Sequence, residues 1–218
     1  MQSKAPRIVL MTDEAGQRPD LPVEHFLFSA SDFQQWTDNG QYNHACKAHA
    51  YIAALRHYGG KLAMIDTDTY FVADPMRLFD RVNTHTSIMH ADEGTLDHQG
   101  GAWHDVVRRT GESPDVLGGI TLQSRMLNSG VVACDASMLP LLEATPTMID
   151  ALRAVGAPFN SEQFAFAQVL LRAGEVDVCD DLVQHYWGFE RRFIHSRIAR
   201  LMPDRTQAVF QAALGVDM

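Results

Sequence analysis

Lysine is scarce in this chain, which has only Lys4, Lys47 and Lys61. Lys and Arg together number 18 against 27 Asp and Glu, which gives a formal net charge of −9 at pH 7. Nucleic-acid binding depends on many cationic side chains that neutralise phosphates, so this balance argues against a nucleic-acid partner. An anionic ligand would need a bound cation or a few well-placed basic side chains.

Cysteine is sparse too, and long apolar runs are missing. Cys46, Cys134 and Cys179 form no Cys-x-x-Cys pair, so we expect neither a disulfide framework nor a structural zinc site. No run approaches the roughly 18 apolar residues of a membrane span. The segment Met1–Arg7 lacks the apolar core of a signal peptide. We therefore expect a cytoplasmic protein with at most peripheral membrane contact.

What the chain does contain is an alternation of short apolar runs and helix-like segments. The predicted strands are Ile8–Met11, His25–Phe28, Leu62–Ile65, Ser87–Met89, Val131–Cys134 and Val176–Cys179. The predicted helices are Asn43–Tyr58, a helix that begins at Asp74 and Pro75, Ala102–Thr110, Ser137–Val155 with a break near Pro146, Asn160–Leu171 and Gly188–Met202. Residues 91–101 are polar and Gly-rich, which predicts a loop.

This alternation predicts an α/β fold with a mostly parallel, mixed sheet flanked by helices. The length favours one domain over residues 1–218, in which residues 203–218 form a C-terminal tail. In such sheets, ligands bind outside the carboxyl ends of the strands. The residues that follow the predicted strands are therefore the first candidates for a functional site.

Two aspartates, Asp66 and Asp68, directly follow the predicted strand Leu62–Ile65. In an extended chain, residues i and i+2 point to the same side, so the two carboxylates can share one divalent cation. Mg²⁺ and Mn²⁺ favour oxygen ligands and often link one or two carboxylates to substrate phosphates. The competing interpretation makes both aspartates ordinary turn or cap residues.

Four segments, taken in order along the chain, resemble motifs of one enzyme family. Met64–Phe71, with the sequence MIDTDTYF, resembles the DxD segment of GT-A-fold nucleotide-sugar glycosyltransferases, in particular the retaining, family-8-like bacterial members. Met126–Val132 resembles the family's Asn-Ser-Gly segment, Asn160–Gln163 its later acidic-Gln segment, and His185–Gly188 its His-x-x-Gly. Arg7–Asp13 resembles the family's second strand, and the usual first strand, which helps to hold the nucleotide base, has no counterpart.

The resemblance implies a GT-A-like, Rossmann-like fold and the metal-dependent transfer of a sugar from a nucleoside-diphosphate donor. It implies Mn²⁺ or Mg²⁺ held by Asp66, Asp68 and His185. The favoured donor is a UDP-sugar, and the acceptor is a glycan, a lipid-linked molecule or a protein. The residues assigned to cofactor and donor binding are Asp66, Thr67, Asp68, Lys47 and Ser129.

Lys47 is the one lysine in a helix near this segment, and it either neutralises a phosphate or is an ordinary exposed helical lysine. The catalytic candidates are Asn128, Gln163 and Glu162. The two amides can bind sugar or acceptor hydroxyls, and Glu162 is the best-placed carboxylate for catalysis or for positioning the sugar. Alternatively, Asn128 belongs to a turn, and Gln163 to a helix capping box with Asn160.

Two other functions remain open from the sequence. A protein of the same fold that binds the nucleotide-sugar without transferring it, or that acts only as a subunit, would fit the missing first strand. A haloacid-dehalogenase-like phosphatase would also place Asp66 and Asp68 after a strand, and Val178–Asp181 imitates its later acidic pair. Tyr70 stands where that family has Thr or Val, and no lysine follows Lys61, so the phosphatase fits less well.

The predicted last helix is basic on one side, through Arg191, Arg192, Arg197 and Arg200. It either covers the sheet with a solvated basic face or docks at a membrane surface. Arg191 and Arg192 also lie where some members of the family carry the lysine of a Lys-Pro-Trp segment, which this chain lacks.

Overall fold

The structure is a computed structural model that describes residues 6–188 and 191–201. Its strands are β1 (Val9–Thr12), β2 (Glu24–Leu27), β3 (Lys61–Ile65), β4 (Thr69–Phe71), β5 (Thr86–Met89), β6 (Asp92–Thr95), β7 (Arg125–Leu127), β8 (Val131–Asp135), β9 (Glu175–Val178) and β10 (Val183–His185). Its α-helices are α1 (Ala30–Trp36), α2 (Ala45–Tyr58), α3 (Met76–Arg81), α4 (Gly101–Arg109), α5 (Pro114–Leu117), α6 (Leu139–Leu142), α7 (Thr145–Ala154), α8 (Ser161–Ala173) and α9 (Arg191–Leu201). Short 3-10 turns lie at Leu96–His98, Thr110–Glu112 and Ala136–Met138.

The central sheet has the strand order β3-β8-β5-β9. β8 runs antiparallel to both β3 and β5, whereas β5 and β9 are parallel. The α/β prediction is confirmed, in one domain with a mixed sheet. Three of its four strands, β3, β5 and β9, point the same way, and β8 runs antiparallel between two of them. The apolar run Val131–Cys134 indicated a strand buried on both faces, and burial does not reveal direction.

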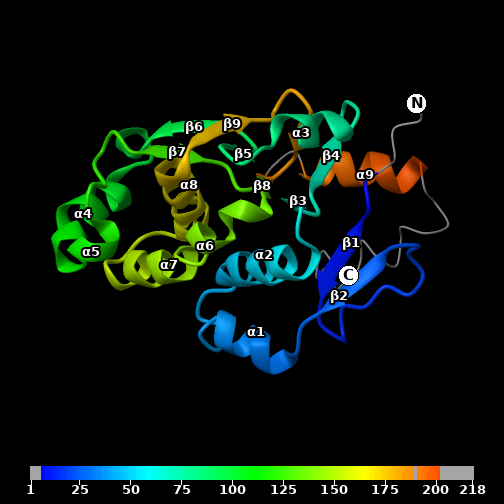
Figure 1. Cartoon of the computed structure of the whole chain (residues 1–218), viewed down its shortest axis with the longest axis horizontal. Helices are drawn as coiled ribbons and strands as arrows, with labels where there is room; N and C mark the ends of the chain where they lie inside the picture. Colours follow the sequence, from blue (N-terminus) through cyan, green and yellow to red (C-terminus); the bar gives the residue numbers. More distant parts are fainter. Residues whose placement is uncertain (1–5, 189–190, 202–218) are drawn as a thin grey trace.

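The two faces of this sheet bury separate apolar clusters. Alternate residues of a strand point to opposite faces, and β8 follows this rule. Val132 and Cys134 belong to the larger cluster, which includes residues of α2, α7 and α8. Val131 and Ala133 belong to the smaller cluster, which includes Leu78 of α3. Figure 1 shows α2 and α3 on opposite sides of β3 and β8.

Each predicted strand is present, with ends that differ by no more than one residue. The predicted start of α3 is confirmed, since Asp74 Oδ1 accepts a hydrogen bond of 2.9 Å from the Met76 backbone N–H. The break predicted near Pro146 lies just before it, because Pro146 is in the first turn of α7. The last helix begins three residues later than predicted, at Arg191, and the predicted tail, residues 203–218, lies outside the described residues.

The loop prediction for residues 91–101 is wrong. This segment contains β6 and a 3-10 turn, and β6 pairs with β7 in an antiparallel ladder. β6 has the sequence Asp-Glu-Gly-Thr, which carries no apolar alternation, so periodicity could not reveal it. A second unpredicted pair joins β4 to β10, also antiparallel. These two outer pairs, β4–β10 and β6–β7, lie outside the central sheet and carry much of the site described below.

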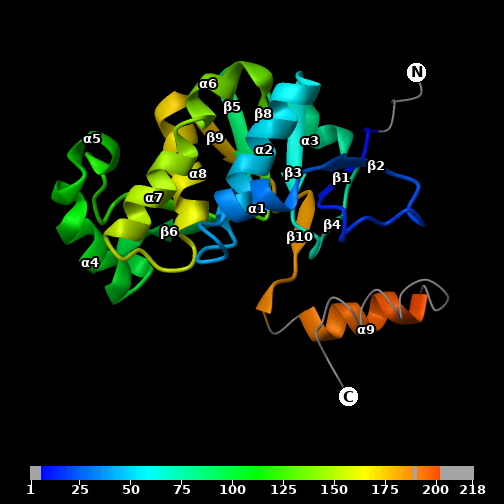
Figure 2. The ribbon, with the colours of Figure 1, turned by 90° about the horizontal axis from the view of Figure 1, so that it is seen from below.

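β1 is the first strand among the described residues, as expected from Arg7–Asp13. It pairs with β2 in a parallel ladder and not with β3, which pairs only with β8 among the described residues. A cavity of about 500 Å³ lies here, and residues of both β1 and β3 line it. Figure 2 shows α9 beyond β10, apart from the helices that pack on the sheet. None of the described helices has the length and apolar character needed to cross a bilayer.

Candidate metal and nucleotide site

Asp66, Asp68 and His185 converge at one point. Each offers one ligand atom, and these three atoms lie within 4.8 Å of one another. His185 Nε2 is 3.2 Å from Asp68 Oδ1 and 4.0 Å from Asp66 Oδ2. The three predicted metal ligands are thus brought together, although His185 is far from the aspartates in sequence.

The β4–β10 pair makes this convergence. Asp66 and Asp68 lie in the turn between β3 and β4, and His185 ends β10, where it is paired with Thr69. The backbone N–H of Tyr186 donates a 3.0 Å hydrogen bond to the Asp68 carbonyl, which extends the ladder into the turn. The imidazole is therefore held beside the carboxylates by backbone hydrogen bonds.

Three electron-pair donors at this spacing repel one another unless a proton or a cation lies between them. The hydrogen bond with His185 holds the pKa of the Asp68 carboxyl below its ordinary value, against the opposing effect of partial burial. Arg191 adds a smaller effect in the same direction. The Asp68 carboxyl therefore favours its ionised form, which is the state that binds a divalent cation.

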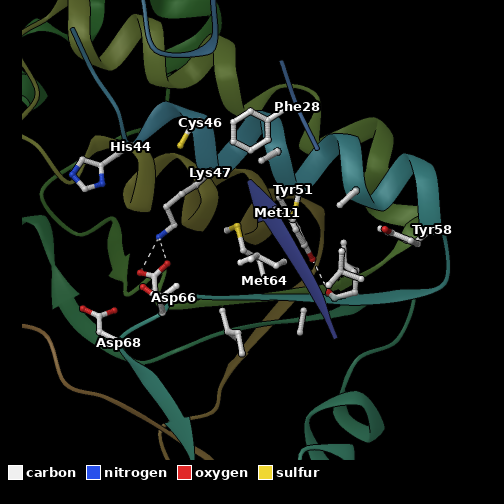
Figure 3. Close-up of a pocket in the computed structure, with 18 of the residues that line it drawn as sticks. Met11, Phe28, His44, Cys46, Lys47, Tyr51, Tyr58, Met64, Asp66 and Asp68 are labelled. Atoms are coloured by element: carbon white, nitrogen blue, oxygen red, sulfur yellow. Dashed lines mark hydrogen bonds and ion pairs between the residues drawn. The ribbon is translucent and has the colours of Figure 1, made fainter. Parts of the chain in front are cut away.

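Lys47 lies beside this group and is not an exposed helical lysine. Its side chain, from the first turn of α2, is 18% exposed, and Nζ lies 3.0 Å from Asp66 Oδ1 and 3.1 Å from Asp66 Oδ2. Nζ also donates to the Ser129 carbonyl at 3.2 Å and to Ser129 Oγ at 3.1 Å. Burial alone would lower the pKa of Lys47, but Glu162 and Asp66 outweigh it and raise that pKa. Lys47 is thus a charged group held in place (Figure 3).

Glu162 lies behind Lys47. Its Oε1 is 3.6 Å from Lys47 Nζ and makes no hydrogen bond to the described residues, and its Oε2 accepts from Ser129 Oγ at 3.3 Å. The residue is 3% exposed, and burial raises the pKa of its carboxyl although Lys47 opposes this. A carboxylate so enclosed contacts Lys47 and Ser129 and does not reach the surface.

Asn128 and Gln163 meet at a residue that sequence reasoning missed, Glu93 of β6. Asn128 Nδ2 donates to Glu93 Oε1 and Gln163 Nε2 to Glu93 Oε2, both at 2.7 Å. Gln163 Oε1 accepts from the Ser129 backbone N–H at 3.2 Å. Glu93 follows the buried strand β5, so the rule that pointed to Asp66 could have found it.

The alternative interpretations of these residues have mixed outcomes. The turn at Asn128 is confirmed, because its Oδ1 accepts from the Gly130 backbone N–H at 2.8 Å. The capping box is wrong, since Asn160 makes no side-chain cap and instead accepts from Trp103 Nε1 at 3.3 Å. Gln163 is free of that role and binds Glu93.

The cavity begins at the metal group and extends between β1, β3 and α2 (Figure 3). One end is polar, with Lys47, Asp66, Thr67, Asp68 and Arg191 among the lining residues. The other end is mainly apolar and aromatic, and its lining includes Leu10, Met11, Phe28, Tyr51 and Tyr58. Ser129, Asn128, Glu162 and Gln163 do not line it, so the predicted residues divide into a cavity wall and a supporting layer.

No family model matches the chain, and no curated protein matches its sequence. The case for a function therefore rests on the geometry of this site and on the four segments that resemble glycosyltransferase motifs.

Proposed function

We propose that the protein is a metal-dependent glycosyltransferase that moves a sugar from a nucleoside-diphosphate donor to an acceptor hydroxyl. The convergence of Asp66, Asp68 and His185, of which the two aspartates line the polar end of a cavity, carries this proposal. Two carboxylates and an imidazole leave coordination positions open, as a site that also binds phosphate oxygens requires.

The donor set favours Mn²⁺ over Mg²⁺, because Mg²⁺ prefers oxygen ligands alone whereas transition metals accept an imidazole nitrogen. When bound, such an ion supplies positive charge that stabilises the departing diphosphate. Lys47 and Arg191, which line the same end of the cavity, add fixed positive charge beside it. An acidic chain with few lysines thus has two cationic groups where a diphosphate would lie.

The cavity supports a nucleotide as the ligand. Its volume of about 500 Å³ lies within the common range for small-molecule sites, about 300–1,000 Å³. A diphosphate at the polar end would extend its nucleoside toward Met11, Phe28 and Tyr58, which offer apolar and aromatic surface. A UDP-sugar is the donor we propose to test first.

Glu162, Gln163 and Asn128 have a supporting role in this proposal. Glu162 holds Lys47, and the two amides bind Glu93. An inverting enzyme needs a base within reach of the acceptor hydroxyl, and none of these three side chains lines the cavity. This arrangement favours a retaining course, in agreement with the family that the motifs resemble.

The phosphatase alternative has less support. Asp181, the second residue of the later acidic pair, forms an ion pair with Arg81 of α3. Neither Asp180 nor Asp181 lines the cavity or joins the metal group among the described residues. The subunit-type alternative shares the donor site, and only a transfer assay separates it from the enzyme.

Thermal unfolding with a panel of nucleoside diphosphates, with and without Mn²⁺, tests the donor site. A ligand at 100 times its dissociation constant stabilises the folded state by about 2.7 kcal/mol, which raises the melting temperature by roughly 5–10 °C at this size. We expect one nucleotide to give this shift only with Mn²⁺. The shift should vanish in Asp68→Asn and persist in the control Asp115→Asn, whose side chain is exposed.

A transfer assay on the same variants completes the test. Loss of the metal's charge should slow transfer in Asp68→Asn about 10²–10⁴-fold, at about 1.4 kcal/mol per decade. Near-normal turnover in that variant would falsify the metal assignment. A nucleotide shift without any transfer or donor hydrolysis would identify the subunit-type protein instead.

A further inference from the structure

Glu93 lies behind the cavity wall and accepts hydrogen bonds from two side-chain amides of the supporting layer. Each of its two oxygens accepts one hydrogen bond of 2.7 Å, from Asn128 and from Gln163. Its place on the β6–β7 pair separates it from the metal group, so it contacts none of the three proposed ligands directly. Its effect on them runs through the two amides.

The first branch leads from Glu93 to His185. Asn128 donates with Nδ2 to Glu93, so its other end is an oxygen, and that oxygen also accepts from the Gly130 N–H. This same Oδ1 lies 3.0 Å from His185 Nδ1. Because an acceptor faces Nδ1, the ring nitrogen must carry the hydrogen. The other ring nitrogen, Nε2, faces Asp66 and Asp68 and donates its hydrogen to Asp68 in the metal-free protein, and a bound cation would take the place of that hydrogen.

The second branch leads from Glu93 to Lys47. Gln163 donates with Nε2 to Glu93, so its Oε1 is the end that accepts from the Ser129 N–H. Ser129 in turn accepts from Lys47 with both its carbonyl and its hydroxyl oxygen. One carboxylate therefore sets the orientation of both amides, and the amides orient the groups on either side of Asp66.

We propose that Glu93 is a positioning residue that fixes His185 with its hydrogen on Nδ1, so that Nε2 binds a divalent cation together with Asp66 and Asp68. The cation in this statement rests on the proposed function, whereas the position of the hydrogen rests on the hydrogen bonds alone. Ligating histidines commonly donate their second N–H to such a partner, and the partner's loss weakens metal binding about 10–100-fold.

The first experiment is spectroscopic and needs no metal. In the metal-free protein, long-range ¹H–¹⁵N NMR correlations distinguish the two ring nitrogens and show which of them carries a hydrogen. The signals of His185 are identified by their loss in His185→Gln. We expect the hydrogen on Nδ1 in the wild type. A ring that carries no hydrogen on Nδ1 overturns the proposal.

The second experiment exchanges the amide and the carboxylate. Asn128→Asp sets two carboxylates against each other, and Glu93→Gln leaves one acceptor for two amide donors. Each single variant should bind Mn²⁺ about 10–100-fold more weakly, measured by electron paramagnetic resonance of the free ion. The double variant restores every bond, because the new amide at position 93 donates to the carboxylate at 128 and accepts from Gln163. We expect it to recover most of the lost affinity.

The outcome depends on whether the effects of the two substitutions on Mn²⁺ affinity cancel or add. Rescue in the double variant supports the proposal, while two losses that simply add overturn it, because independent sites are additive. The control Glu175→Gln removes an exposed carboxylate and should leave Mn²⁺ affinity unchanged. If the wild type binds no Mn²⁺, the proposed function fails, and the NMR result alone then decides whether Glu93 fixes the ring.

Discussion

The buried core around the central sheet and the site residues at the two outer strand pairs, β4–β10 and β6–β7, differ in what holds them in place. In the sheet, the β8 residues Val131–Cys134 are fully buried between apolar clusters on both faces. At the outer pairs, the residues of the site are charged or polar. Hydrogen bonds hold them in place, such as those from Asn128 and Gln163 to Glu93.

The difference separates stability from chemistry. Burial of apolar surface supplies the main folding free energy, whereas hydrogen-bonded side chains add little net stability and fix geometry. Substitutions in the buried core around the sheet should therefore lower the free energy of unfolding. Substitutions of the polar site residues that the outer pairs position should damage the site while the melting temperature changes little. The loss of transfer in Asp68→Asn, with its fold retained, is the largest expected effect of the second kind.

The strongest test of the sheet side is Phe166→Ala. Phe166 of α8 is fully buried and packs edge-on against Tyr51 of α2, with ring centroids 6.1 Å apart. Its truncation should lower the free energy of unfolding by about 3–5 kcal/mol, measured by urea denaturation. Phe159→Ala, at a side chain that is 72% exposed, should cost no more than about 0.5 kcal/mol. Equal losses in the two variants would contradict the assignment of the core.

Gly130→Ala tests the point where the sheet meets the site. A Cβ at this position would overlap the His185 ring and come within 2.9 Å of Asn128 Oδ1, so the imidazole must move. Mn²⁺ affinity should fall about 10–100-fold, as for other losses of ligand positioning, measured by calorimetric titration. Gly111→Ala is the matched control, because nothing lies within 4 Å of its added Cβ. Unchanged Mn²⁺ affinity in Gly130→Ala would mean that the ring position does not matter.

The smallest expected effect is the pH dependence of the free energy of unfolding, and it comes from a cysteine in the buried core. Burial raises the pKa of the Cys179 thiol to about 12, whereas in the unfolded chain it is about 8.5. Between these values the folded state holds the proton that the unfolded state has lost, so the free energy of unfolding falls as pH rises through this window. Urea midpoints at about pH 8 and pH 10 should differ less in Cys179→Ala than in the wild type. An identical slope in both would rule out this contribution.

The sequence was sufficient for the elements whose side chains carry a local signal. Short apolar runs located β1, β3, β5, β8 and β9, and Asp74 with Pro75 marked the start of α3. The same logic placed Asp66 and Asp68 at the carboxyl end of β3, where they are found. These features depend on neighbours along the chain, so periodicity and capping chemistry suffice to predict them.

Tertiary structure alone decided the direction of β8, the β4–β10 and β6–β7 pairs, and the role of Glu93. Strand pairing depends on which strands meet in space. The strands of the outer pairs have only three or four residues each, which is too short for a periodic signal. The burial of Lys47 and Glu162 and the hydrogen-bond partners of Asn128 also follow from contacts between distant segments. The sequence by itself therefore identified the candidate cation ligands. Only the fold decided which other side chains position those ligands, because hydrogen bonds between separate elements exist only once the elements have packed.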